Sequence, residues 1–113
     1  MRNTTDAVKP IRFDTDAVPD PSSPTTTKQW YGDSTGGFRS GFWASRPGRS
    51  EVHYRTDELC VILEGVVRLI DEAGHAETYR RGDTFLIPNG FKGIWETVEP
   101  TRKFYAIHDP ARG

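Results

Sequence analysis

The chain has 113 residues, of which 35% are hydrophobic and 27% are charged, with 15 Lys and Arg against 16 Asp and Glu. This length allows one compact domain with a single core. The formal net charge of −1, without any Lys/Arg-rich run, excludes the electrostatic pattern of nucleic-acid and anionic-membrane binders. No apolar stretch is long enough for a signal peptide or a membrane span, and the single cysteine permits no internal disulfide. We therefore expect a cytoplasmic protein.

Residues 1–29 are predicted to form an irregular N-terminal arm. Between residues 18 and 27 the chain consists almost entirely of Pro, Ser, Thr and Asp, which is typical of an extended loop. Ile11 and Phe13 alternate with polar neighbours. This alternation predicts one short strand that docks on the body of the domain or on a partner.

Residues 30–113 are predicted to form a single all-β domain. Turn signals rich in Gly, Pro, Asn and Asp recur every eight to ten residues, and no helix-length amphipathic window interrupts them. The intervening segments are short and rich in β-forming residues: 59–63, 66–70, 76–79, 84–87, 94–98 and 103–108. So many short strands would leave long bare edges in an open sheet. The pattern predicts an antiparallel jelly-roll barrel of eight to ten strands from about Trp30 to His108.

Alternation within the segment 59–63 predicts which side chains face inward. Cys60 and Ile62 share one face, whereas Leu59, Val61 and Leu63 share the other. Both faces are apolar, so one can line the barrel while the other needs a cover. For a barrel of this size a second copy of the chain is the simplest cover, and we expect a homodimer.

Two glycine-bounded segments, 48–65 and 82–90, resemble the two motifs of the cupin superfamily. His53 precedes Glu58 by four intervening residues, and six residues separate Glu58 from Gly65, as in the first cupin motif. The second motif is matched by Gly82, Pro88 and Gly90. This resemblance implies a cupin barrel that holds a small molecule, and commonly a metal ion, in its interior.

The segments 57–65, 93–96 and 102–105 narrow the resemblance. They are similar to the small cupin family named for ureidoglycine aminohydrolase, over roughly residues 30–108. The resemblance implies metal-assisted hydrolysis or isomerisation of a small polar metabolite. It does not identify the substrate, because a shared fold does not fix a reaction.

The chain departs from the cupin pattern at two of the four ligand positions. Glu51 stands at the first histidine position and Gly93 at the histidine position of the second motif. Glu51 and His53 are two residues apart and share a strand face. If Glu58 faces them from the next strand, the three side chains could hold Mn²⁺, Fe²⁺, Zn²⁺ or Ni²⁺ with water completing the coordination.

A metal-free barrel is the competing interpretation. Two buried carboxylates beside one imidazole are costly without a cation, unless the pocket is open to water. Gly93 offers no ligand at all, which favours a binding module without metal over a metal-dependent enzyme. A third interpretation makes the jelly roll purely structural, with its interior filled by Trp95 and its neighbours.

The predicted pocket also contains side chains outside the metal set. Trp95 shares a face with Gly93 and forms an aromatic wall where the missing histidine would have reached. Cys60 lies on the inward face beside Glu58, where a buried thiol behaves as a small hydrophobe. Lys103 and Tyr105 are candidates to orient a carboxylate or carbonyl group. The predicted pocket residues are Glu51, His53, Glu58, Cys60, Trp95, Lys103 and Tyr105, with Tyr54 as a further lining candidate.

Overall fold

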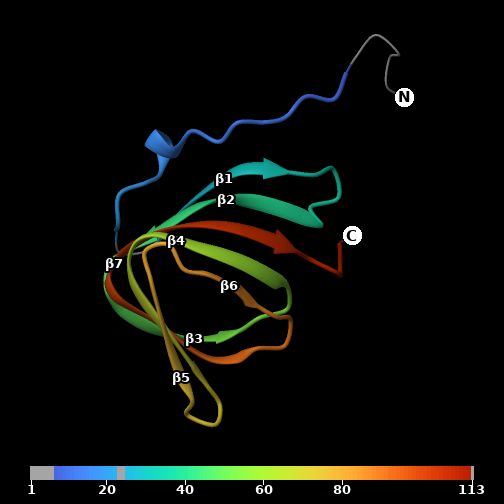
Figure 1. Cartoon of the computed structure of the whole chain (residues 1–113). Helices are drawn as coiled ribbons and strands as arrows, with labels where there is room; N and C mark the ends of the chain where they lie inside the picture. The colour runs from blue at the N-terminus through green and yellow to red at the C-terminus, as the bar shows by residue number, and fades with distance from the viewer. Residues whose placement is uncertain (1–6, 23–24, 113) are drawn as a thin grey trace.

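The computed structural model describes residues 7–22 and 25–112. Seven antiparallel strands between Thr26 and His108 form one sheet that curls into a barrel (Figure 1). A short 3₁₀ helix, η1 (Thr15–Ala17), precedes the barrel. The strands are β1 (Thr26–Gly32), β2 (Phe38–Ser45), β3 (Gly48–His53), β4 (Asp57–Asp71), β5 (Ala76–Arg80), β6 (Thr84–Ile87) and β7 (Lys92–His108). The predicted all-β jelly-roll class is confirmed.

The two longest strands, β4 and β7, pair with each other along most of their lengths. Each was predicted as two separate strands, so the described residues contain seven strands rather than eight to ten. Gly65 explains the continuity of β4. Its φ of 100° is in the left-handed region, and a Cβ there would lie 2.3 Å from the carbonyl oxygen of Pro100. Glycine therefore lets β4 bulge at this turn signal and continue.

The alternation predicted for the first half of β4 is confirmed. Cys60 and Ile62 are at most 1% exposed, whereas Leu59 on the opposite face is 39% exposed. The inward residues belong to a core cluster that comprises Cys60, Ile62, Val67, Leu69, Phe85, Ile87 and Trp95. This core is thus contributed by β4, β6 and β7.

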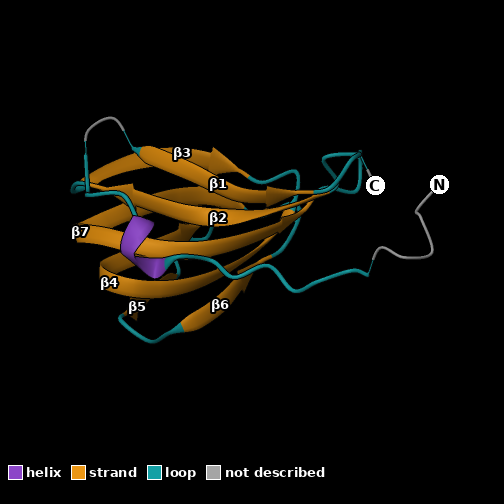
Figure 2. Cartoon of the chain, turned by 90° about the horizontal axis from the view of Figure 1, so that it is seen from above, coloured by secondary structure: helices purple, strands orange, loops and turns teal. Residues whose placement is uncertain are grey.

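The N-terminal arm crosses the outer face of the sheet (Figure 2). Its aromatic anchor is Phe13, whose ring lies 5.7 Å from Trp30, 6.0 Å from Phe42 and 5.7 Å from Phe104 between centroids. The predicted strand at residues 11–13 is wrong, because this segment pairs with no strand and packs on the sheet through the ring of Phe13. The structure also assigns residues 26–29, predicted as arm, to β1.

A second anchor of the arm is polar. Arg102 on β7 donates from Nε to the carbonyl oxygen of Pro19 at 3.1 Å. The same guanidinium forms ion pairs with Asp20 of the arm and with Glu64 of β4. The arm is therefore fastened to the barrel at two places, one aromatic and one ionic.

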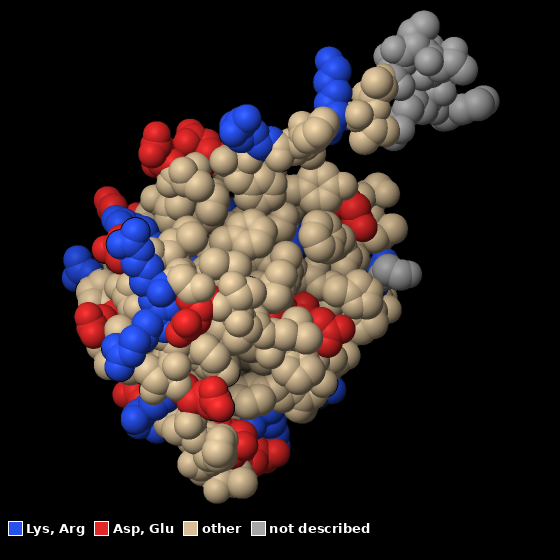
Figure 3. Space-filling model, in the orientation of Figure 1, with Lys and Arg blue, Asp and Glu red and all other residues tan. Residues whose placement is uncertain are grey.

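Charged side chains of both signs are interspersed on the face shown in Figure 3, around a largely uncharged centre. Across the described residues, no helix has the length and apolarity required to cross a membrane.

An exposed apolar pair on the outer face carries a prediction about assembly. Leu59 and Leu86 are cross-strand partners and are 39% and 58% exposed. We expect a second copy to cover this pair, so that light scattering at micromolar concentration detects twice the 12.7 kDa chain mass. Leu86→Lys should shift the protein toward monomer. Val98→Lys, at another exposed apolar position, should leave the dimer intact, and a wild-type monomer would contradict the expectation.

Candidate functional site

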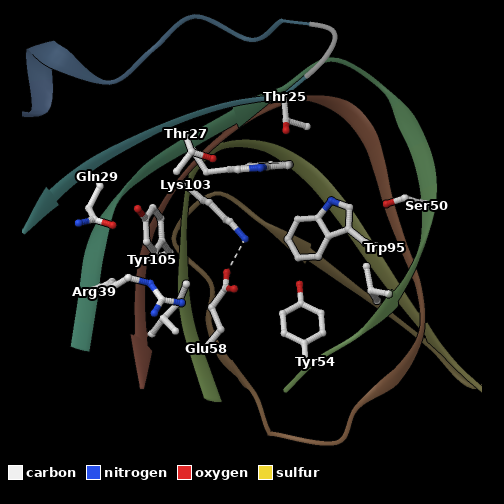
Figure 4. Close-up of a pocket in the computed structure, with 13 residues that line it drawn as sticks. Thr25, Thr27, Gln29, Arg39, Ser50, Tyr54, Glu58, Trp95, Lys103 and Tyr105 are labelled. Atoms are coloured by element: carbon white, nitrogen blue, oxygen red, sulfur yellow. Dashed lines mark hydrogen bonds and ion pairs between the residues drawn. The ribbon is translucent and has the colours of Figure 1, made fainter. Parts of the chain in front are cut away.

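A cavity of about 390 Å³ opens inside the barrel, and we call it the barrel pocket (Figure 4). Five strands and their flanking residues contribute to its walls. The lining residues are Thr25, Thr27, Gln29, Arg39, Trp43, Ser50, Val52, Tyr54, Glu58, Trp95, Lys103, Tyr105 and Ile107. The lining thus combines aromatic rings with hydroxyl and amide groups, and it contains the buried, oppositely charged pair Glu58 and Lys103.

The charged pair consists of Glu58 on β4 and Lys103 on β7. Lys103 Nζ donates to Glu58 Oε2 at 2.7 Å, and both side chains are almost fully buried (Figure 4). Cys60 Sγ donates to the same oxygen at 3.3 Å and lies 3.6 Å from Lys103 Nζ. The carboxylate thus has two donors, which offset part of the cost of removing these charges from water.

Two indole rings complete the surroundings of the lysine. Lys103 Nζ lies 4.2 Å from the ring centroid of Trp95 and 4.8 Å from that of Trp43. The two indoles meet edge to face, with centroids 5.4 Å apart at 78°. Trp43 is the partner of Lys103 in the β2–β7 ladder, and Trp95 is held by a hydrogen bond from its Nε1 to Thr97. Cation–π attraction therefore adds to the ion pair in fixing the ammonium group.

Arg39 is the second cation of the barrel pocket, and it too has a partner. Its Nη1 donates to the carbonyl oxygen of Gly36 at 2.7 Å and to Asp109 Oδ2 at 3.3 Å. Each cation is thus paired with a carboxylate: Lys103 with Glu58, and Arg39 with Asp109. The pocket is consequently balanced in charge, although it is rich in polar groups.

Two tyrosines supply neutral hydroxyl groups. Burial raises the pKa of Tyr54 and of Tyr105, and the negative charge of Glu58 raises both further. Both phenols therefore keep their protons at neutral pH and can donate hydrogen bonds. In Figure 4 the Tyr54 hydroxyl points into the pocket between Glu58 and Trp95.

The structure brings together most of the residues predicted for the pocket. Glu58, Trp95, Lys103 and Tyr105 line the same cavity, and Cys60 lies directly behind Glu58.

Contrary to the prediction, Glu51 and His53 do not line the barrel pocket. Both are exposed and border a separate surface depression that also includes Lys92. In the β3–β7 ladder, Ser50 pairs with the inward Trp95, and directly paired residues share a face of the sheet. Successive side chains of a strand point to opposite faces of the sheet. Because Ser50 points inward, Glu51 and His53 point outward.

The side chains present do not fit a cupin metal centre. Glu51 and His53 are separated from Glu58, and within the described part of the chain no three His, Cys, Asp or Glu side chains gather as a metal site. The Glu58 carboxylate already binds the ammonium of Lys103, whose charge would repel a divalent cation. At Gly93 a Cβ would lie 2.0 Å from the carbonyl oxygen of Ile70, so a histidine there requires a backbone shift.

Several pocket residues were absent from the predicted set. Ser50 and Val52 could have been recognised, because the polar residues 49, 51 and 53 alternate with the inward positions as in a strand with one solvated face. Trp43 and Arg39 could not be placed, since the sequence interpretation assigned no strand to their segment. Tertiary pairing of β2 with β7 brings both into the pocket.

The buried ion pair carries a stability prediction. Lys103→Met should destabilise the protein by about 3–5 kcal/mol, because it leaves the Glu58 carboxylate buried without its partner. The double variant Glu58→Leu/Lys103→Met should recover most of that loss. Urea unfolding of the single and double variants measures the coupling. Lys92→Met is the matched control: Lys92 pairs with Glu72 at 3.8 Å in solvent, and its loss should change stability by less than ~0.5 kcal/mol.

If Lys103→Met lowers the free energy of unfolding no more than Lys92→Met does, the buried Glu58–Lys103 pair does not stabilise the fold as predicted. If the double variant is less stable than the single variant, the uncompensated carboxylate is not the cause of the loss.

Cys60 carries a prediction about pH. Burial raises the pKa of its thiol to about 12, with the nearby Lys103 ammonium opposing and Glu58 supporting the shift. A raised acid pKa contributes stability that is complete below the unfolded value of about 9 and is lost as pH rises toward 12. At pH 8 we expect a disulfide reagent to label native Cys60 at least ~100-fold more slowly than the unfolded chain. Equal rates would show an accessible thiolate.

Comparisons with known proteins bear on the fold and the family of the chain. A family model described as the EutQ-like cupin domain matches residues 32–105. No functionally curated protein shows significant similarity to the chain.

Solved structures show the same fold. A DUF861 family protein from Thermotoga maritima is 34% identical, with a TM-score of 0.55 over 57% of this chain and 73% of its own. The Clostridium difficile EutQ protein is 16% identical, with a TM-score of 0.67 over 88% and 81%. The cupin domain of Schizosaccharomyces pombe Cnp3 is 13% identical, with a TM-score of 0.73 over 89% and 75%. These matches support the predicted cupin superfamily but not its narrower ureidoglycine aminohydrolase-type branch. The chain belongs to the family of EutQ-like cupin domains.

Proposed function

We propose that this cupin domain binds a small, uncharged polar organic molecule in the barrel pocket without a metal ion. The observation that carries the proposal is the Glu58–Lys103 pair, which occupies the interior with its own fixed cation. A lysine ammonium so placed performs the electrostatic task of a bound metal, since it can donate hydrogen bonds to a ligand oxygen.

The walls of the pocket support this class of ligand. A volume of about 390 Å³ is within the range of small-molecule sites. Trp43, Trp95 and Tyr54 offer ring surface to a planar or carbon-rich body. Ser50 and Gln29 add polar groups that can fix its orientation. Because both cations are already paired, a neutral ligand enters without disturbing an ion pair.

Metal-assisted hydrolysis or isomerisation, implied by the ureidoglycine aminohydrolase-type resemblance, is supported less well. It would need Glu51 and His53 to face Glu58, and both lie outside the barrel pocket. A purely structural role is also less well supported, because the interior retains a cavity with polar lining. We accordingly propose neither ureidoglycine as the ligand nor a metal as the cofactor.

The experiment uses indole signals as reporters of the pocket. The three tryptophans are Trp30, Trp43 and Trp95, and the last two line the cavity, whereas Trp30 packs outside against Phe13. In protein treated with a chelator, we expect benzyl alcohol to shift the indole N–H resonances of Trp43 and Trp95 but not that of Trp30. Assignment by Trp→Phe substitution identifies each resonance.

Divalent metals provide the opposing arm of the test. Mn²⁺, Fe²⁺, Zn²⁺ and Ni²⁺ should each change the melting temperature by less than ~1 °C, because residues 7–22 and 25–112 assemble no donor set for them. Stoichiometric metal that survives purification and raises the melting temperature by several degrees would overturn the metal-free proposal. Ligand shifts confined to Trp30 would overturn the assignment of the site.

A further inference from the structure

We propose that Lys103 is a nucleophile that forms an imine with a small aldehyde or unhindered ketone in the barrel pocket. This inference rests on the proposed function, because the carbonyl compound must first bind in that pocket. It goes further in giving Lys103 a covalent role and in naming the chemical class of the ligand.

The geometry contains the three parts of an activated nucleophile. The nucleophile is Lys103, the only lysine among the described residues that line the barrel pocket. The base is Glu58, whose Oε2 lies 2.7 Å from Lys103 Nζ. The orienting group is Cys60, whose Sγ donates to that same oxygen at 3.3 Å. A nucleophile within hydrogen-bond reach of a base that a third group holds in place is the common arrangement in covalent catalysis.

The surroundings of Nζ suit both the starting ammonium and the product. A protonated imine carries one positive charge at the same nitrogen. Glu58 and the ring faces of Trp43 and Trp95 would therefore stabilise it as they stabilise the ammonium. The charge of the pocket does not change when a neutral carbonyl compound reacts. This match favours an uncharged carbonyl ligand over a carboxylate, which would compete with Glu58 for the lysine.

The reaction balances with groups present at the site. Glu58 takes one proton from the ammonium, and the freed lone pair of Nζ attacks the carbonyl carbon while the C=O π electrons move to oxygen. Glu58 returns that proton to the oxygen and then takes a second proton from nitrogen, which gives the neutral carbinolamine. Delivery of the second proton to the hydroxyl group breaks the C–O bond and releases water. The nitrogen lone pair forms the C=N bond, so ammonium and carbonyl become protonated imine and water.

Tyr54 is placed to assist at the oxygen. Its phenol stays protonated because burial raises its pKa, and its hydroxyl points into the pocket between Glu58 and Trp95 (Figure 4). A hydroxyl donor there can hydrogen-bond the carbonyl oxygen as negative charge develops on it during attack. Tyr54 is thus a positioning and charge-stabilising residue in this step.

The test traps the imine by reduction. The wild-type chain is incubated at pH 7 with benzaldehyde and cyanoborohydride, which reduces protonated imines to stable secondary amines, and the adducts are located by peptide mass mapping. We expect Lys103 to be labelled at least tenfold faster than the exposed Lys9, Lys28 and Lys92. Labelling of Lys103 no faster than those lysines overturns the proposal.

Two variants test the assigned roles. Glu58→Gln should slow labelling of Lys103 at least tenfold and leave Lys28 and Lys92 unchanged, because it removes the proton acceptor. Lys103→Arg keeps a cation beside Glu58 but cannot form an imine, so it should yield no adduct in the pocket. If Glu58→Gln does not fold, the wild-type ratio of Lys103 to Lys92 labelling decides alone.

Benzyl alcohol, the reduced and unreactive counterpart of benzaldehyde, separates this inference from the proposed function. If benzyl alcohol shifts the Trp43 and Trp95 indole resonances but benzaldehyde does not label Lys103, the imine is wrong and ligand binding stands. If neither probe affects the pocket, both proposals fall.

Discussion

The antiparallel pairing of β4 with β7 is the constraint on which the rest of the structure depends. These two strands lie at the centre of the sheet, and every other strand except β1 pairs with one of them. Their ladder places Glu58 and Lys103 on the same inner surface, although 45 positions separate them in the chain. Because Gly65 permits β4 to bulge without ending, one pair of strands spans both the packed core and the open pocket.

The positive charge inside this barrel belongs to a side chain of the chain itself. The family resemblance implies ligands that surround a divalent cation, and here one lysine provides a single positive charge from within the chain. A covalently attached cation cannot dissociate or exchange, and its position is set by the carboxylate and two indoles.

The sequence was informative where local pattern and spacing decide the outcome. Alternation identified Cys60 and Ile62 as inward, and motif spacing identified Glu58 as a pocket residue. It failed at Glu51 and His53, because the family motif and the polar–apolar alternation of β3 place these residues on opposite faces, and the strand follows its alternation. The partnership of Lys103 with Glu58 and Trp43 arises from strand register, which no local pattern encodes. The strand count failed for a related reason, since a glycine signals a turn and a bulge alike.

The two anchors of the N-terminal arm respond in opposite ways to the solvent. The contacts of Arg102 with Asp20 and Glu64 involve exposed carboxylates, so dissolved salt screens them. The packing of Phe13 on Phe42 and Phe104 is apolar, and excluded salts such as sulfate strengthen it. Ionic strength therefore loosens one end of the arm while the other stays seated. Salt therefore weakens the ionic anchor selectively, while the ring of Phe13 continues to cover Phe42, whose side chain is only 2% exposed.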